Sequence, residues 1–245
     1  MPLSRRTCLG LLGASLAAPA WADAAQDGRL TARPGASPPI AARFGYVPLG
    51  LDSPQRDAWL YTPKAASAGT PMPLLVMLHG SGDSARGIAE EIAPQAEARG
   101  FALLAPKSRG ATWDLHHAPA CDDAAFVDKA LARTFAMLRT DPARIAIGGM
   151  SDGASFALSL GVTNGDLFSD VIAFSGGYLR FAGIAGHPRI FISHGQADRI
   201  IPFKLGRRIA DTLTADGLDV TFREFDGGHE IPSEGLRAAL DRFLK

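Results

Sequence analysis

The sequence predicts one α/β domain, with a mainly parallel sheet covered by helices on both faces. Short apolar runs alternate along the chain with stretches of helical periodicity. The runs are continuously apolar, which is typical of strands buried on both faces. Glycine-rich segments with polar side chains follow several runs, at the edge where a parallel sheet places its ligands. With 245 residues, the chain is long enough to bury a core without disulfides or metal.

The expected strands and helices follow one another in order along the chain. Two candidate edge strands come first, and we expect neither a second domain nor a large cap over the site. The edge strands lie at 44–48 and 58–61, and the apolar runs lie at 74–78, 101–105, 145–147, 171–175, 190–193 and 220–225. Helices are predicted at 85–99, 122–139, 153–163, 203–216 and 233–244.

The first 22 residues have the order of an export signal. Arg5 and Arg6 precede a 13-residue apolar run from Cys8 to Ala20, and small residues mark a cleavage site before Asp23. The run is too short to span a hydrocarbon core of about 30 Å. The paired arginines favour the twin-arginine route, so we expect a periplasmic or secreted protein. A retained anchor and a cytoplasmic protein with an apolar start are the alternatives.

Residues 23–42, rich in Ala, Pro, Gly and Ser, are predicted to form a flexible leader before a single domain at 43–245. Without Arg5 and Arg6 the chain has 23 basic and 25 acidic residues, a net charge of about −2. This balance predicts no nucleic-acid partner, and loss of the signal predicts no stable membrane insertion. Cys121 then has no partner for an internal disulfide. The sequence leaves the oligomeric state open.

The most informative motif lies between a predicted strand and a predicted helix. Gly149-Met150-Ser151-Asp152-Gly153 has the pattern G-x-S-x-G, the layout of a nucleophile elbow. Such a turn strains the serine backbone and leaves little room beside it, which accounts for glycine at both ends. The motif therefore predicts that Ser151 attacks an acyl carbon. Because the chain holds 27 glycines, the pattern is weak alone and depends on its surroundings.

Candidate catalytic partners of Ser151 follow later strands. A serine hydroxyl needs a base to take its proton, and His229, in a Gly-Gly-His loop after the last strand, is the predicted base. Asp198, in the loop after the fifth apolar run, would hold the other imidazole nitrogen and fix its tautomer. Asp170 and Asp226 are the reserve acids. The chain order Ser, Asp, His is the one expected for an α/β-hydrolase.

Two backbone N–H groups should stabilise the oxyanion of a tetrahedral intermediate. One is the N–H of Asp152, directly after the nucleophile. The other is expected from the glycine-rich loop after His79, from Ser81 or, alternatively, from Gly82. We expect His79 and His194, each at a strand end, to brace their loops instead of acting as further bases.

The loop at 107–121 follows a strand end and should border the site. Trp113 resembles similarly placed tryptophans of esterases, and this resemblance implies the wall of an acyl or alcohol pocket; plain burial of its ring at the loop base is an equal alternative. Met150, Phe203 and Ile231 are further pocket candidates that are equally compatible with a place in the core.

The adjacent histidines His116 and His117 have no spaced third ligand, so the sequence predicts neither a metal site nor a cofactor.

From Leu74 onward the chain resembles the α/β-hydrolase superfamily, in particular its compact bacterial esterases. The segments LHGSGD, GGMSDG, SHGQADRIIP and GGHEIP are similar to those of carboxylesterase/phospholipase-like and polyhydroxybutyrate-depolymerase-like members. The resemblance implies the fold and the triad, and it leaves the substrate open. Asp152 is a departure, because these families often carry Gln, Asn or His there. We expect its carboxylate to point away from the nucleophile and cap the elbow helix; if it pointed inward, strongly acidic substrates would be disfavoured.

The expected activity is hydrolysis of a small-molecule carboxylic ester through an acyl-enzyme intermediate. A thioester is the nearest alternative, because the mechanism does not distinguish the two. Short polyesters or their oligomers are a further alternative. A non-catalytic binding protein of the same fold, or a peptidase, is less compatible with a complete Ser151-Asp198-His229 set and a short chain without a gating domain.

Overall fold

A computed structural model describes residues 28–35, 43–65, 70–114, 122–181 and 183–245. The predicted export signal at 1–22, His116, His117 and Cys121 lie outside the described residues. No helix in the described part of the chain is long and apolar enough to cross a membrane.

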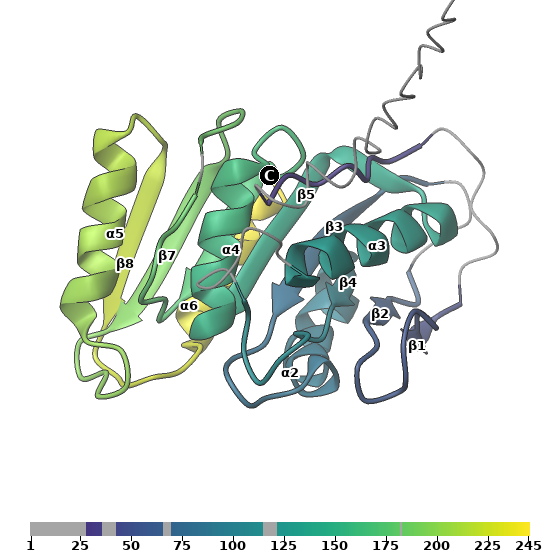
Figure 1. The fold of residues 1–245 in the computed structure, drawn as a ribbon, viewed down its shortest axis with the longest axis horizontal. Helices are drawn as coiled ribbons and strands as arrows, with labels where there is room; N and C mark the ends of the chain where they lie inside the picture. Colours follow the sequence, from purple (N-terminus) through teal and green to yellow (C-terminus); the bar gives the residue numbers. More distant parts are fainter. Residues whose placement is uncertain (1–27, 36–42, 66–69, 115–121, 182) are drawn as a thin grey trace, which may run out of the picture.

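Eight strands form one sheet in the described residues, in the order β1-β2-β4-β3-β5-β6-β7-β8 (Figure 1). β2 is antiparallel to β1 and β4, and all other neighbours are parallel, which confirms the mainly parallel sheet and its antiparallel edge. The strands are β1 (Gly45–Pro48), β2 (Trp59–Thr62), β3 (Met72–Leu78), β4 (Ala102–Ala105), β5 (Thr140–Met150), β6 (Asp170–Phe174), β7 (Arg189–Gly195) and β8 (Val220–Phe225).

Helices cover both faces of this sheet, as predicted. α3 and α4 lie in front of the sheet in Figure 1, and α6 lies behind it. One apolar cluster joins the sheet to α3, α4 and α5, and a second joins the opposite face to α2 and α6. The helices are α2 (Ala85–Arg99), α3 (Asp122–Met137), α4 (Asp152–Thr163), α5 (Phe203–Ala215) and α6 (Ser233–Phe243).

β5 is longer than the apolar run that predicted it. The run covers 145–147, whereas the strand begins at Thr140 and continues to Met150. The early part of β5 is Asp-Pro-Ala-Arg, which is partly buried or exposed and carries no apolar signal. The register with β3 also shifts between Met72 and Leu74. The pair Met72–Thr140 is therefore separated from the regular pairing that begins at Leu74 and Ile145.

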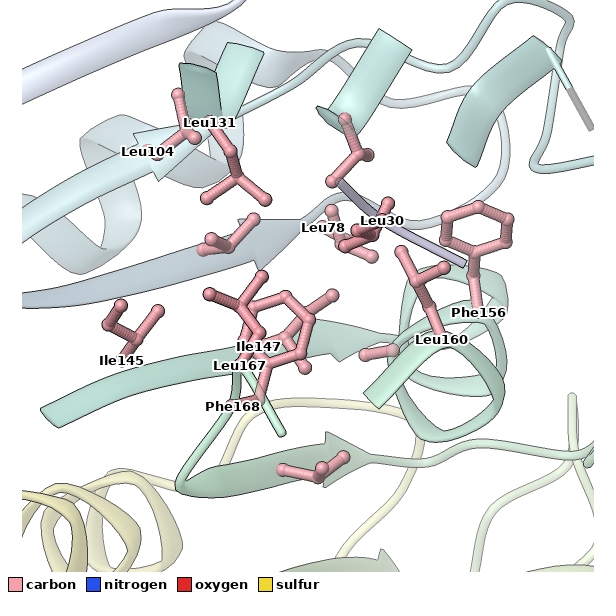
Figure 2. Close-up of a cluster of buried hydrophobic side chains, with 14 of the residues drawn as sticks. Leu30, Leu78, Leu104, Leu131, Ile145, Ile147, Phe156, Leu160, Leu167 and Phe168 are labelled. Atoms are coloured by element: carbon pink, nitrogen blue, oxygen red, sulfur yellow. The ribbon is translucent and has the colours of Figure 1, made fainter. Parts of the chain in front are cut away.

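Residues 28–35 differ from the flexible leader that the sequence predicts for 23–42. Leu30 is buried among core side chains that include Leu160 and Leu78 (Figure 2). Its backbone N–H donates to Asn164 Oδ1 at 2.8 Å, and Asn164 Nδ2 donates to the Gly28 carbonyl at the same distance. The buried side-chain amide of Asn164 therefore provides hydrogen-bond partners for the backbone of this extended segment, much as a neighbouring strand would.

Charged side chains hold the same segment from outside. Arg29 and Arg33 both pair with Asp166, at 3.0 and 2.7 Å. Asp128 on α3 accepts hydrogen bonds from the backbone N–H groups of Thr31 and Ala32, each at 2.8 Å. Composition predicts a flexible leader because these partners lie between 96 and 137 residues away in the sequence and become neighbours only in the fold.

Candidate active site

Ser151 lies in a sharp turn between the end of β5 and the start of α4. Its backbone has φ 58° and ψ −120°, a conformation that a residue with a side chain rarely adopts. The Ser151 N–H donates to the Phe174 carbonyl on neighbouring β6 at 2.9 Å. A strained serine on a strand-to-helix turn is the geometry predicted for a nucleophile elbow.

The two glycines of the motif sit where a side chain has no room. A Cβ on Gly149 would lie 2.3 Å from backbone atoms of Gly153. A Cβ on Gly153 would lie 2.4 Å from the Leu78 carbonyl oxygen and 2.5 Å from that of His79, at the end of β3. Glycine at 149 is thus required for the turn to close on the start of α4, and glycine at 153 is required for the elbow to pack against the end of β3.

We predict that Gly153→Ala destabilises the protein by several kcal/mol, on the order of an overpacked core site. The new Cβ would meet main-chain atoms of β3, which cannot rotate away as a side chain would. Urea unfolding of the variant measures the loss. Gly183→Ala is the matched control, because a Cβ there meets nothing within 4 Å. Equal free energies of unfolding for the two variants would contradict the steric argument.

Asp198 and His229 are brought together as predicted. His229 Nδ1 lies 2.7 Å from Asp198 Oδ2, and the Asp198 side chain is fully buried. Asp198 Oδ1 accepts the backbone N–H groups of Ile200 and Ile201, each at 2.9 Å. Burial alone would raise the pKa of Asp198, but the bonds from His229 and the two N–H groups outweigh it and lower the pKa below its ordinary value.

The reserve acids are placed less suitably. Asp170 starts β6, at the opposite end of that strand from Ser151, and its carboxylate pairs with Arg189 at 2.8 Å. Asp226 is exposed. Asp198 is therefore the acid that the fold positions against His229.

The structure does not join Ser151 to His229 directly. Among the hydrogen bonds of the described residues, none runs from Ser151 Oγ to the imidazole. Both residues follow carboxyl ends of parallel strands, Ser151 after β5 and His229 after β8. Hydrogen bonds between catalytic groups often tighten only when substrate binds, so the absence of this bond does not contradict the predicted proton transfer.

The glycine-rich loop after β3 lies beside the elbow. A Cβ on Gly80 would lie 3.5 Å from Ser151 Cβ. The Gly82 N–H donates to the Ala111 carbonyl at 2.9 Å, so it is already engaged. The N–H groups of Ser81 and Asp152 donate to no other group in the described part of the chain. Of the two alternatives for the second oxyanion donor, the geometry therefore favours Ser81 over Gly82.

His79 braces this loop, as predicted. Its side chain is fully buried; Nδ1 bonds to the Gly80 carbonyl at 2.7 Å, and Nε2 accepts the Ser108 N–H at 3.1 Å. These two bonds need a neutral ring with its proton on Nδ1. Burial lowers the pKa of His79 to about 4, and the charge of nearby Lys107 acts in the same direction.

We predict that this histidine makes stability depend on pH. The unfolded chain takes up a proton on His79 near pH 6.5, whereas the folded chain does so only near pH 4. Unfolding therefore binds the extra proton, and the free energy of unfolding falls as pH drops through this interval, by up to about 3 kcal/mol. Urea titrations at several pH values measure how the free energy of unfolding depends on pH. This dependence should be weaker in His79→Gln than in the wild type. His187→Gln, at an exposed histidine, should keep the wild-type slope, and identical slopes for all three proteins would contradict the assignment.

His194 has a similar bracing place. It is fully buried, and its Nε2 bonds to the Ile201 carbonyl at 2.9 Å. The same nitrogen lies 3.3 Å from Asp198 Oδ2. His194 thus fixes the loop that carries the acid, in agreement with the sequence prediction.

Trp113 lies beneath the loop, where the sequence predicted a pocket wall or a buried ring. It is only 3 % exposed, its Nε1 donates to the His79 carbonyl at 2.9 Å, and its ring stacks on Phe156. The cavity that it lines with Asp152 has a volume of about 10 Å³, roughly the space that one water molecule needs. Trp113 therefore supports the loop from below, and this cavity is too small for an acyl group.

The Asp152 carboxylate points to the loop after β4. Thr112 Oγ1 donates to Asp152 Oδ2 in a short hydrogen bond. The carboxylate is thus held by Thr112, and the helix-capping role expected from the sequence is replaced by this contact. Its backbone N–H stays at the start of α4, beside Ser151.

The remaining pocket candidates are partly buried. Met150 and Ile231 pack against the cluster that joins α2 and α6 to the sheet. Phe203, in the first turn of α5, meets the rings of Phe222 and His194 edge to face. Each of the three lies next to a predicted catalytic segment and also forms part of the packing.

The sequence missed Asp123, which organises the loop at 107–114. Its buried carboxylate accepts the N–H groups of Arg109 and Asp114, at 2.5 and 2.8 Å. Burial, together with the charge of Asp114, raises the pKa of Asp123 to about 6. In the sequence it is one of two acids in a helical first turn, a common and favourable arrangement that carries no sign of this role.

Comparisons with known proteins bear on the family and the fold of the chain. The family model described as Phospholipase/Carboxylesterase matches residues 123–245, just over half of the chain. The chain is 35% identical over 108 residues to acyl-protein thioesterase 1 of Neurospora crassa, covering 40% of this chain and 44% of that protein. It is 29% identical over 117 residues to the protein of the same name from Emericella nidulans, covering 42% and 49%. The matches thus span less than half of each curated relative.

Solved structures show the same fold. Esterase PE8 has a TM-score of 0.62 at 24% identity, covering 75% of this chain and 95% of that one. The serine hydrolase FphF of Staphylococcus aureus has a TM-score of 0.66 at 15% identity, covering 82% and 98%. Acyl-protein thioesterase 2 of Zea mays has a TM-score of 0.54 at 22% identity, covering 77% and 99%. At these identities the likeness concerns the fold alone.

Proposed function

The chain belongs to the phospholipase/carboxylesterase family of α/β-hydrolases, and on that premise we propose that it cleaves carboxylic esters through an acyl-enzyme on Ser151. The observation that carries the proposal is the strained Ser151 turn, with φ 58° and with Gly153 packed against the end of β3. A hydroxyl held in this way stands clear of its own backbone and beside the loop of Gly80.

In this mechanism His229 takes the proton from Ser151 Oγ as the oxygen attacks the ester carbonyl carbon. The N–H groups of Ser81 and Asp152 donate to the oxyanion that forms. The C–O bond of the leaving alcohol breaks, and His229 returns the proton to that oxygen. Water, deprotonated by His229, then attacks the acyl carbon, the bond from that carbon to Ser151 Oγ breaks, and His229 returns the proton to Oγ, which releases the acid and free Ser151. Asp198 stays ionised throughout, because its pKa is lowered below the ordinary range of an aspartate.

A thioester is the second candidate substrate. It is favoured by the curated relatives, which are named acyl-protein thioesterases. The chemistry is the same, with a thiol in place of the alcohol as leaving group. Short polyester oligomers fit the same reaction class, as the sequence resemblance suggested.

Paired substrates and a covalent probe test the proposal. Ethyl butyrate and its thioester S-ethyl thiobutyrate share an acyl group, so the ratio of their kcat/KM values separates esterase from thioesterase preference. A fluorophosphonate should add its mass to the peptide that contains Ser151, because only an activated serine reacts. Absence of turnover on both substrates together with an unlabelled Ser151 would refute the proposal.

We also propose that residues 1–22 direct export to the periplasm or beyond. Replacing both Arg5 and Arg6 by Lys should leave the precursor in the cytoplasm of a bacterial host, because the twin-arginine route reads the arginine pair. Cell fractionation followed by immunoblotting measures this. Arg43→Lys is the control for an arginine substitution outside the signal. A mature protein in the periplasm for both variants would contradict the twin-arginine assignment.

A further inference from the structure

The carboxylate of Asp123 closes a short loop beside the candidate active site. Asp123 lies in the first turn of α3 and is fully buried. Its Oδ1 accepts the Arg109 N–H at 2.5 Å, and its Oδ2 accepts the Asp114 N–H at 2.8 Å. In return, the Asp123 N–H donates to Asp114 Oδ2 at 3.4 Å. One carboxylate thus holds both ends of the segment 109–114 and ties that segment to α3.

Two groups of this segment hold the glycine-rich loop after β3. The Ala111 carbonyl accepts the Gly82 N–H at 2.9 Å. Trp113 Nε1 donates to the His79 carbonyl, also at 2.9 Å. These two bonds lie on either side of Ser81, whose N–H is one of the two proposed oxyanion donors. The place of the Ser81 N–H therefore depends on the segment 109–114.

A third group of the segment reaches the other proposed donor. Thr112 Oγ1 donates to the Asp152 carboxylate in a short hydrogen bond, and the N–H of Asp152 is the second donor. The segment 109–114 is thus bonded to the chain at both halves of the proposed oxyanion hole. Such donors must lie about 2.7–3.1 Å from the oxyanion. A misplacement of about 1 Å can lower the rate by about 10²-fold, so the anchor of this segment bears on the reaction.

We propose that Asp123 is a positioning residue for the oxyanion hole beside Ser151, an inference that rests on the proposed function. Asp123 acts through the segment 109–114, because its two oxygens are engaged by the N–H groups at the ends of that segment. An ionised carboxylate has two acceptor oxygens and no donor, whereas an amide of the same shape would turn its NH₂ against one of those N–H groups. Burial raises the pKa of Asp123 to about 6, so the carboxylate is ionised at about pH 8.

The first test compares Asp123→Asn with Asp122→Asn, the same chemical change at the exposed neighbouring residue. Donors to the oxyanion act on the transition state more than on the bound ester. At about pH 8 we therefore expect Asp123→Asn to lower kcat for ethyl butyrate by about 10- to 100-fold and to change KM by less than about 3-fold. Asp122→Asn should keep both wild-type values.

A thionoester distinguishes displaced donors from a general loss of folded enzyme. O-Ethyl thionobutyrate has sulfur in place of the carbonyl oxygen, and donors placed for oxygen fit the larger sulfur poorly. The ratio of kcat/KM, ester over thionoester, should therefore fall about 10-fold in Asp123→Asn and stay at the wild-type value in Asp122→Asn. A partly unfolded protein loses both activities equally and keeps the ratio. If the wild type is an active esterase, an unchanged ratio in Asp123→Asn overturns the inference.

Hydrogen exchange followed by NMR tests the inference without turnover. In Ser151→Ala we expect the Gly82 N–H to exchange about 10-fold faster once Asp123→Asn is added, because its acceptor Ala111 is no longer held at both ends of the segment. Addition of Asp122→Asn should leave the rate unchanged. A wild type without ester turnover refutes the proposed function alone. An unchanged exchange rate after Asp123→Asn then overturns the present inference as well.

Ala111→Gly replaces Asp123→Asn in both tests if the latter does not fold. Ala111 is exposed, and glycine there keeps the carbonyl that accepts the Gly82 N–H while it adds backbone freedom to the segment. The ester-over-thionoester ratio should fall and the exchange of the Gly82 N–H should quicken, each by about 3-fold. Wild-type values for both would overturn the inference, because a loosened segment would then leave the donors in place.

Discussion

Ser151→Ala is expected to lower kcat for ester hydrolysis by about 10⁴- to 10⁶-fold, the range found when the nucleophile of a serine hydrolase is removed. The elbow strain and the Ser151 N–H bond to Phe174 belong to the backbone, so they persist in the variant. The loss therefore reports chemistry at Oγ. Initial rates on p-nitrophenyl butyrate measure it, after correction for spontaneous hydrolysis.

Two further observations make that result specific. Ser53→Ala, at an exposed serine before β2, should retain the wild-type rate. The urea midpoint of Ser151→Ala should equal or exceed that of the wild type, because alanine has a smaller side chain in a strained turn. Equal rates for Ser151→Ala and wild type would remove the nucleophile assignment and, with it, the proposed mechanism.

Asp198→Asn is expected to lower kcat by about 10⁴-fold. The asparagine oxygen should keep the bonds from the Ile200 and Ile201 N–H groups, which would turn its NH₂ toward His229 Nδ1. That nitrogen must then accept, so the imidazole proton moves to Nε2, and the ring can no longer take a proton from Ser151. The fold is preserved while the tautomer is wrong.

The pH dependence of the rate distinguishes this cause from simple misfolding. A base with the wrong tautomer should be bypassed as hydroxide becomes available, so the rate of Asp198→Asn should rise with pH well beyond the wild-type plateau. Asp211→Asn, on the exposed face of α5, is the matched control and should follow the wild-type profile. A loss smaller than about 10-fold in Asp198→Asn would show that another acid orients His229.

Local sequence carried much of the proposed site. The elbow motif predicts a strained Ser151 because glycine pairs and a strand-to-helix transition are visible in ten consecutive residues. The same is true of the Asp198 and His229 loops, since each directly follows an apolar run. A parallel sheet brings such loops to one edge whatever the details of packing, so their spatial grouping follows from strand order alone.

Other features depend on partners that are distant in sequence. The composition around Leu30 predicts a leader, because its core neighbours, such as Leu160, are far along the chain (Figure 2). The sequence gives Trp113 two equal interpretations, and the hydrogen bond from its Nε1 to the His79 carbonyl shows that it supports the loop. Asp123 looked like an ordinary helix-start acid, although its carboxylate holds two N–H groups of the loop at 107–114.

The sequence by itself therefore determined the fold class, the order of the catalytic candidates and the type of chemistry, because each is encoded in short contiguous segments. Only the tertiary structure decided which N–H groups are free for an oxyanion and where the Asp152 carboxylate points. Whether a polar group is hydrogen-bonded depends on the residues that surround it in space, and these can be far apart in the sequence. Strands β3, β4 and β5 bring those neighbours together from segments that share no local pattern.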